Sequence, residues 1–262
     1  MSLFGIGEME LAIVVLLRIL GFFATAPFFS GKYINNYVKI GISFIIALFV
    51  VFNNNGITLP YNFFGNTLGY AGICIIEVII GAMIGFCSTI VFNIVIFAGS
   101  LIDTQAGLTM ATVYDPSSST QLAITANLYY YALIMVFLVT NMHHSFIKAI
   151  FYSYDILKIG MFNVAGPTIS YMISLITEFF LLGFKFASPV IAAMLILDVG
   201  LGILVRAVPQ MNVFIVGFPL KLAIFMLIMI LATELFINNY AYIYDKTLSV
   251  IINVIRLFGL SP

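Results

Sequence analysis

Charged residues are scarce in this 262-residue chain, which has 10 Lys and Arg, 10 Asp and Glu, and 8% charged residues in all. Soluble domains carry about a quarter charged residues, so an ordinary soluble protein is excluded. The formal net charge of zero leaves no basic surface to follow a phosphate backbone, which disfavours a nucleic-acid partner. Hydrophobic residues make up 63% of the chain, and we therefore expect a protein embedded among membrane lipids.

Cysteine is also rare, and both copies fall in one apolar run. Cys74 and Cys87 would stand about 20 Å apart on a helix that rises about 1.5 Å per residue, which is too far for a disulfide bond. A reactive thiol needs an electropositive and partly exposed setting that this run lacks. We therefore expect both cysteines to be small buried hydrophobic residues.

Enzymatic motifs are missing. His143 and His144 are adjacent and have no further ligand at metal-binding spacing, so a helical metal site is not expected. Gly200 and Gly202 lack the third glycine and the preceding strand of a nucleotide-binding loop. The serines at 117–119 have no positioned base. We expect no catalytic residue, no metal and no cofactor.

The chain divides into six apolar blocks, which predicts an all-α membrane protein of one helical domain, residues 1–262, without a separate soluble catalytic domain. The second block is short for a full crossing; the third suits one strongly tilted helix or two helices meeting at a break. Glu8 and Glu10 stand where a signal peptide would carry basic residues, so we expect the first block to be retained. The blocks are Leu11 to Phe29, Val38 to Phe52, Leu68 to Ile102, Leu122 to Thr140, Ile169 to Leu197 and Val213 to Ile237.

Two further segments, about 142–160 and 240–258, are amphipathic rather than spanning. Either can lie at the membrane interface or dock a partner helix. Gly81 and Gly85 form a small-xxx-small step within the third block, which is compatible with close helix packing.

Several charged residues lie inside the apolar blocks, where each costs at least about 2.5 kcal/mol near a bilayer centre. Two interpretations compete: the charges line a transport path or proton relay, or they pair with opposite charges where helices pack on protein and partner subunits. Lys and Arg are almost balanced between alternate loops, so no positive-inside bias orients the chain, and this favours assembly. The charged residues are Arg18, Glu77, Glu178, Lys185, Lys221 and Glu234.

The longest polar interruption, residues 103–117, is rich in small residues and has no Lys or Arg. Irregular backbone at membrane depth is tolerated only where protein or a water-filled cavity satisfies its amides, so this segment can line or close a conduit. Gly107 gives conformational freedom, while Leu108 and Met110 supply a deformable apolar surface. The alternative is an ordinary exposed loop that ends at the Asp115-Pro116 turn.

A second interruption, residues 198–212, separates the last two blocks and predicts a hairpin corner, because Pro209 ends or kinks a helix. Arg206, Gln210 and Asn212 can satisfy carbonyl groups freed at that corner. Alternatively, they contact a partner subunit.

These two segments, with Arg18 and Pro27, resemble the FliR/SctT family of type III export-gate subunits over nearly the whole chain. The quoted matches are Asp103-x-Gln105-x-Gly107 with Asp115-Pro116, and Arg206-x-x-Pro209-Gln210-Met211-Asn212 followed by Pro219-x-Lys221. The resemblance implies a subunit of the bacterial inner membrane and the flagellar basal body, joined to FliP and FliQ and contacted by FlhB and FlhA. Unfolded exported flagellar proteins would pass through that assembly.

By position, the resemblance implies that the segment with Gly107 and Met110 is a plug-like loop closing the conduit. Pro209, Gln210 and Asn212 would form the hairpin corner, and part of the complex would stand above the bilayer. Two alternatives stay open at this point. One is the equivalent subunit of a virulence injectisome, and the other is a proton-coupled secondary transporter using Glu77, Glu178 and Lys185.

Overall fold

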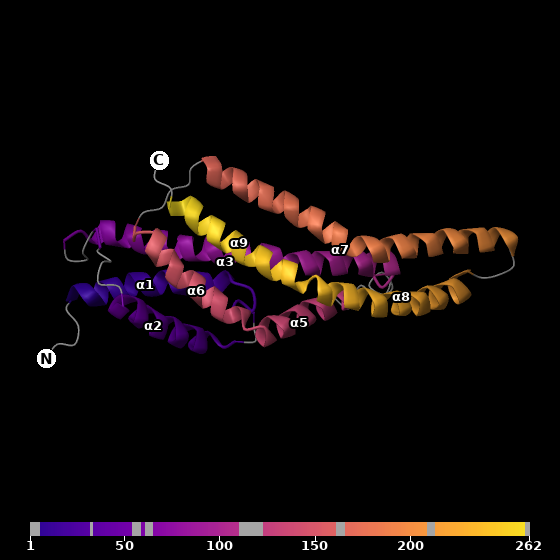
Figure 1. The fold of residues 1–262 in the computed structure, drawn as a ribbon, viewed down its shortest axis with the longest axis horizontal. Coiled ribbons are helices and arrows are strands. Elements are labelled where there is room, and N and C mark those ends of the chain that lie inside the picture. Colours follow the sequence, from indigo (N-terminus) through magenta and orange to yellow (C-terminus); the bar gives the residue numbers. More distant parts are fainter. Residues whose placement is uncertain are drawn as a thin grey trace. The chain divides into compact units, whose positions relative to one another are not determined.

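The computed structural model describes residues 6–31, 34–53, 59–60, 65–109, 123–160, 166–208 and 213–259. Within these ranges all regular structure is helical, which confirms the predicted all-α class (Figure 1). The helices are α1 (Ile6–Thr25), α2 (Asn36–Asn53), α3 (Thr67–Ala106), α5 (Ile124–Val139), α6 (Met142–Ile156), α7 (Gly166–Ala207), α8 (Val213–Asn238) and α9 (Tyr240–Gly259).

Each of the six predicted apolar blocks lies mainly within one helix. The third block is a single unbroken helix, α3, of 40 residues. At about 1.5 Å per residue α3 is roughly twice as long as a bilayer core is thick. Among the described residues, four helices are long and apolar enough to cross a membrane, namely α2, α3, α7 and α8, and the bent pair α5–α6 counts as a fifth if it crosses as one.

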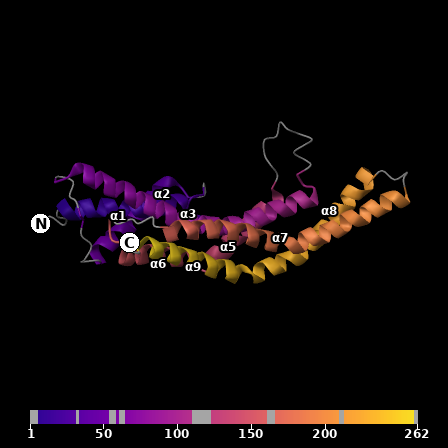
Figure 2. The same ribbon diagram turned by 90° about the horizontal axis from the view of Figure 1, so that it is seen from above.

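The described residues group into two compact units, and α3, α5, α7 and α9 each contribute to both. Unit 1 comprises residues 1–91, 138–175 and 244–262; unit 2 comprises residues 92–137 and 176–243. In unit 1, α2, α6 and the first part of α3 lie beside α1, as Figures 1 and 2 show. Its buried apolar residues include Val14 and Phe22 of α1 and Val250 and Ile251 of α9.

Helices α6 and α9 are amphipathic, as the sequence predicts. On α9, Val254, Ile255 and Phe258 are buried, whereas Asn253 and Arg256 are exposed. On α6, buried residues likewise recur every three to four positions, so they form one face of the helix. These apolar faces are covered by unit 1 of the chain itself.

The packing of α1 on α3 depends on glycine. A Cβ atom built at Gly81 would overlap the backbone carbonyl of Arg18, and one at Gly85 would stand 2.6 Å from the carbonyl oxygen of Phe22. Thr25 Oγ1 donates to the carbonyl oxygen of Ala82 at 2.9 Å across the same contact. The Gly81–Gly85 step therefore brings the two helix backbones together, as the sequence predicts.

Unit 2 consists of the second part of α3, most of α5, most of α7, all of α8 and the first residues of α9. Tyr129 of α5 stacks on Phe236 of α8 with ring centroids 4.7 Å apart. On α3, Gly99 allows close approach of α5, because a Cβ atom there would stand 2.6 Å from the amide nitrogen of Ala126.

Candidate functional site

The polar interruption after α3 is shorter than the sequence suggests, because residues 103–106 form the last turn of the helix. Gly107 ends α3 with a φ of +81°, a left-handed conformation that glycine adopts without strain. The amide of Gly107 donates to the carbonyl of Thr104 at 3.2 Å, and that of Leu108 donates to the carbonyl of Asp103 at 3.1 Å. This pair of hydrogen bonds is a Schellman C-cap.

Asp103 joins the two ends of the segment that follows. Its side chain is 1% exposed, and its carboxylate accepts hydrogen bonds from the amides of Thr125 at 2.9 Å and Ala126 at 3.3 Å. Those amides belong to the first turn of α5, whose N–H groups have no partner within the helix. A residue at the end of α3 therefore caps the start of α5. Residues 107–122 lie between these points in the chain; of them, Met110, Asp115 and Pro116 fall outside the described residues.

Gln105, two residues further along α3, contacts a carboxylate on α7. Its Nε2 donates to Oδ2 of Asp198 at 3.2 Å. Lys221 of α8 approaches the same carboxylate, with Nζ 2.7 Å from Oδ1 and 3.0 Å from Oδ2. Gln105, Asp198 and Lys221 thus link α3, α7 and α8 near the end of α3, and we call them the Asp198 cluster.

Residues 198–207, predicted as part of a break, instead continue α7. The prediction of a corner starting at Asp198 was therefore wrong at its N-terminal side, since Gly200 and Gly202 are accommodated inside the helix. Arg206 lies exposed in the last turn of α7, where its charge suits the negative end of the helix dipole. Pro209, Gln210 and Asn212 lie outside the described residues.

The first of the predicted buried charges form an ion pair in unit 1. Nε of Arg18 lies 2.5 Å from Oε2 of Glu77, and the two side chains are 1% and 0% exposed. Arg18 also donates to the carbonyls of Ser153 and Leu157, each at 3.2 Å, and its guanidinium lies 4.3 Å from the ring centroid of Tyr154. The second oxygen of Glu77 accepts from the amide of Gly160 at 2.9 Å. This pairing of opposite charges within protein is what the assembly interpretation predicts.

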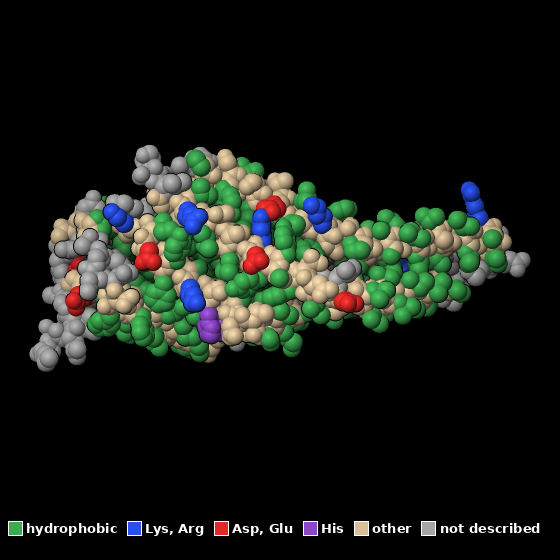
Figure 3. Space-filling model, viewed as in Figure 1, with side chains coloured by type: hydrophobic (Ala, Val, Ile, Leu, Met, Phe, Trp, Pro, Cys, Tyr) green, Lys and Arg blue, Asp and Glu red, His purple; other side chains and the backbone are tan. Residues whose placement is uncertain are grey.

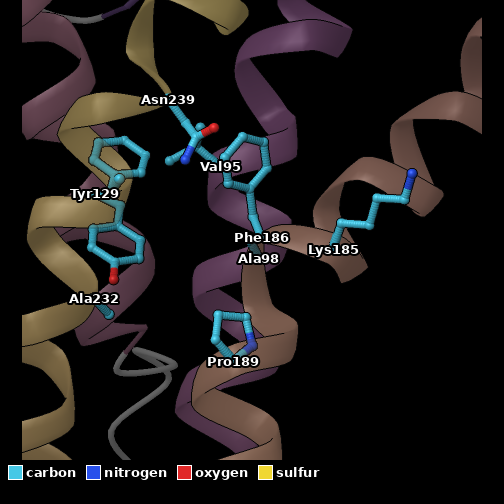
Figure 4. Close-up of a pocket in the computed structure, with 9 residues that line it drawn as sticks. Val95, Ala98, Tyr129, Lys185, Phe186, Pro189, Ala232 and Asn239 are labelled. Carbon is cyan, nitrogen blue, oxygen red and sulfur yellow. The ribbon is translucent and has the colours of Figure 1, made fainter.

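Two of the remaining predicted charges, Glu178 and Lys185, lie on α7, while Lys221 and Glu234 lie on α8. Glu178 is half-buried, and Lys185 is exposed and forms no ion pair among the described residues. Lys185 also borders a small cavity of about 130 Å³ in unit 2, lined mainly by apolar and aromatic side chains. Figure 4 shows its ammonium group pointing away from the aromatic rings.

The cavity lies where Pro189 interrupts the hydrogen bonds of α7. Proline cannot donate to the carbonyl of Lys185, and the hydroxyl of Ser188 donates to it instead at 2.8 Å. The cavity is thus a packing feature of a proline site. Within the described residues, no group of three His, Cys, Asp or Glu side chains could hold a metal ion.

Sequence reasoning missed Asp198 as a site residue, although it belonged to the predicted break. The signal that could have found it is its charge in an apolar stretch, followed 23 residues later by Lys221. The partners of Arg18 on α6 were also missed, because Ser153 and Tyr154 resemble ordinary residues of an amphipathic helix.

Apolar side chains remain exposed along α7 and α8. In Figure 3, hydrophobic side chains cover much of the visible face and charged ones are scattered singly. Five exposed residues recur every three to four positions on α7 and mark one face of the helix: Ile169, Ile173, Ile176, Phe180 and Phe184. Long apolar helices with a paired internal charge and exposed apolar faces define an integral membrane protein.

Comparison with known proteins identifies the family. Residues 9–247 match the family of bacterial export proteins, family 1, and the chain belongs to that family. It is 28% identical to the flagellar biosynthetic protein FliR of Bacillus subtilis, covering 95% of this chain and 96% of the relative. It is 30% identical to FliR of Escherichia coli, and the match covers 80% of this chain and 78% of the relative. The Yop proteins translocation protein T of Yersinia pestis is 30% identical over 59% of this chain and 60% of its own length.

These findings confirm the predicted resemblance. The chain is a membrane subunit of the flagellar protein export gate and is not an enzyme. The flagellar relatives cover more of the chain than the injectisome relative, which favours the flagellar alternative. Membership of this family also argues against the alternative that the chain is a secondary transporter.

Proposed function

We propose that the chain is a structural and gating subunit that joins FliP and FliQ in a heteromeric complex of the bacterial inner membrane, at the flagellar basal body. FlhB and FlhA contact this complex, and unfolded flagellar proteins pass through it. Membrane lipids cover the apolar faces that other subunits leave open. Residues 107–122, which we call the gate loop, close the conduit until a protein is exported.

The observation that carries this proposal is the uneven burial of the long helices. In the most apolar stretch of α7, 11% of the residues are buried within the chain. In the most apolar stretch of α3, 44% are buried. Helix α7 has 42 residues, about 60 Å at the usual rise, whereas a bilayer core is about 30 Å thick. Lipid therefore covers only part of a helix of this length unless it is strongly tilted. Partner subunits are the natural cover for the rest.

The arrangement around the gate loop supports the gating part of the proposal. The Asp103 carboxylate holds the beginning of α5 against the end of α3, so the loop leaves and re-enters the protein at one place. Gly99 allows these helices to touch at the same point.

Deletion of residues 107–110 tests the gating role. In an otherwise assembled export complex, we expect this deletion to increase the resting leak of ions or small solutes, because the apolar segment with Leu108 and Met110 is removed. The measurement is ion conductance of the complex in a planar bilayer. Unchanged conductance in a complex of normal native mass would contradict the gating role and would leave an ordinary loop.

Arg206→Ala tests the assembly role of the end of α7. Arg206 is exposed, so we expect its loss to weaken association with partner subunits while the subunit itself still folds. The matched control is Arg256→Ala, which removes an exposed arginine from the last turn of α9. A fully assembled but non-exporting Arg206→Ala complex would instead assign this residue to transport.

A further inference from the structure

An exposed lysine of α7 borders the apolar cavity of unit 2. The cavity has a volume of about 130 Å³; Lys185 and Pro189 of α7 line one side of it, and residues of α3, α5 and α8 complete its walls. We propose that this cavity is a binding site for an anionic phospholipid: part of one acyl chain fills the apolar interior, and the phosphate pairs with Lys185. The inference rests on the contact with membrane lipids in the proposed function and gives that contact a specific place.

The inner and outer sides of the cavity differ in polarity. The inner walls are buried apolar and aromatic side chains, namely Val95, Ala98, Tyr129, Ala232 and Phe236. The hydroxyl group of Tyr129 is directed to Sδ of Met229, 3.8 Å away. On the outer side, Lys185 and Asn239 are exposed, and the ammonium group of Lys185 points away from the rings (Figure 4). This arrangement suits a ligand with one apolar end and one anionic end.

The volume of the cavity suits part of one acyl chain. An engineered apolar cavity of about 150 Å³ in another protein stays dry and binds benzene, so a cavity of this size accepts a few methylene groups. An empty cavity destabilises a protein in proportion to its volume, because the surrounding atoms lose packing contacts. A lipid chain gains no hydrophobic free energy by leaving other lipids. Packing inside the cavity and the charge contact at its edge therefore supply the affinity.

The position of Lys185 along α7 suits the depth of lipid headgroups. Residues 166–184 extend about 28 Å at the usual helical rise, and one bilayer core is about 30 Å thick. An exposed lysine is unfavourable at the centre of a bilayer but is attracted to anionic lipids near its surface. Glu178 lies seven positions earlier on the same helix, about 10 Å along its axis. Lys185 forms no ion pair among the described residues, so a lipid phosphate would supply the opposite charge.

The first test removes the cation. Dioleoyl phosphatidylglycerol is titrated into the detergent-extracted complex of this chain with FliP and FliQ, and native mass spectrometry counts the bound lipids. We expect one phosphatidylglycerol per copy of this chain to bind about fivefold more weakly in Lys185→Met, because one lysine near the headgroups contributes a modest attraction. Lys148→Met removes an exposed lysine from α6 and should leave this Kd unchanged. Dioleoyl phosphatidylcholine, which has no net charge, should bind the unmodified complex more weakly than phosphatidylglycerol.

The second test fills the cavity. Ala232→Leu adds an isopropyl group at its wall, and we expect the Kd of the same lipid to rise about tenfold, because less of the chain fits. Ala192→Leu is the matched control, since it adds the same group at an exposed position of α7 away from the cavity. Inorganic phosphate and glycerol phosphate lack the acyl chain. We expect neither to displace the lipid, and displacement by either would overturn the role of the cavity.

The outcomes separate the inference from the function on which it rests. If the complex assembles but Lys185→Met and Ala232→Leu bind the lipid normally, the inference is wrong and the proposed function stands. A loss of lipid binding that Lys148→Met or Ala192→Leu shares also overturns the inference. If Lys185→Met releases FliP or FliQ while lipid binding is unchanged, this lysine contacts a partner subunit instead. If no complex forms even with the unmodified chain, the proposed function fails, and the same titration of the full chain alone decides the lipid site.

Discussion

Arg18 and Glu77 are 59 positions apart in the chain and form an ion pair that is sealed from solvent, with Nε and Oε2 2.5 Å apart. The remaining hydrogen-bonding groups of both side chains are used as well, by carbonyls of α6 and by the amide of Gly160. Such a pair is weak evidence for stability but strong evidence against free movement, because either partner alone would be a buried charge. It fixes the positions of α1, α3 and α6 relative to one another within unit 1.

Removing one member of this pair should be more harmful than removing both. We expect Arg18→Met to lower the free energy of unfolding by roughly 3–5 kcal/mol, and the double variant Arg18→Met with Glu77→Leu to lower it by less. The measurement is the unfolding of unit 1 by denaturant, followed in the detergent-extracted complex. Equal or greater loss in the double variant would show that the charges themselves stabilise the protein.

Close packing of α1 on α3 gives a second prediction. Gly81→Ala should destabilise the protein by about 1–3 kcal/mol, because the added methyl group overlaps the backbone of α1 at Arg18. Gly72→Ala is the matched control on the same helix, since nothing lies within 4 Å of a Cβ atom there. Alanine forms helices better than glycine, so the control should be neutral or slightly stabilising. Thermal unfolding of both variants decides the matter, and similar melting temperatures would refute this account of the contact.

The third prediction concerns Asp103. Asp103→Ala removes the cap of α5 and should cost about 0.5–2 kcal/mol, the usual range for an N-cap. Asp103→Asn keeps one acceptor oxygen and should recover part of the loss. Amide hydrogen exchange at Thr125 and Ala126 reports the effect directly, because their N–H groups lose their acceptor. Unchanged protection at these two amides would contradict the capping role.

The sequence predicted the fold well because apolar blocks of membrane length leave few alternatives to helices. Its errors lie at helix ends. Residues 198–212 with Pro209 were predicted as a break, yet α7 continues to Ala207, since backbone groups in an apolar setting are best satisfied within a helix. Asp103 was expected in a loop and instead ends one helix and caps another, a contact between residues 22 positions apart.

The sequence predicted several residues of the candidate site, but it did not predict which of them contact one another. Arg18 and Glu77 were recognised as charges that must find partners, but which helix supplies them depends on how α1 and α3 align, and Gly81 sets that alignment in three dimensions. Lys221 was predicted at the hairpin region, yet its contact with Asp198 requires both α7 and α8 to be placed. Such pairings depend on how the helices pack in three dimensions, and the pattern of residues along one sequence does not reveal that packing.

The central claim, that this subunit works only within a heteromeric complex, is tested most directly by native mass. The protein is extracted in mild detergent after expression alone and after expression together with FliP and FliQ. We expect a defined heteromeric complex only on co-expression, because the uncovered apolar faces of α7 and α8 then find their partners. A stable monomer or homodimer whose mass does not change when FliP and FliQ are present would contradict the claim.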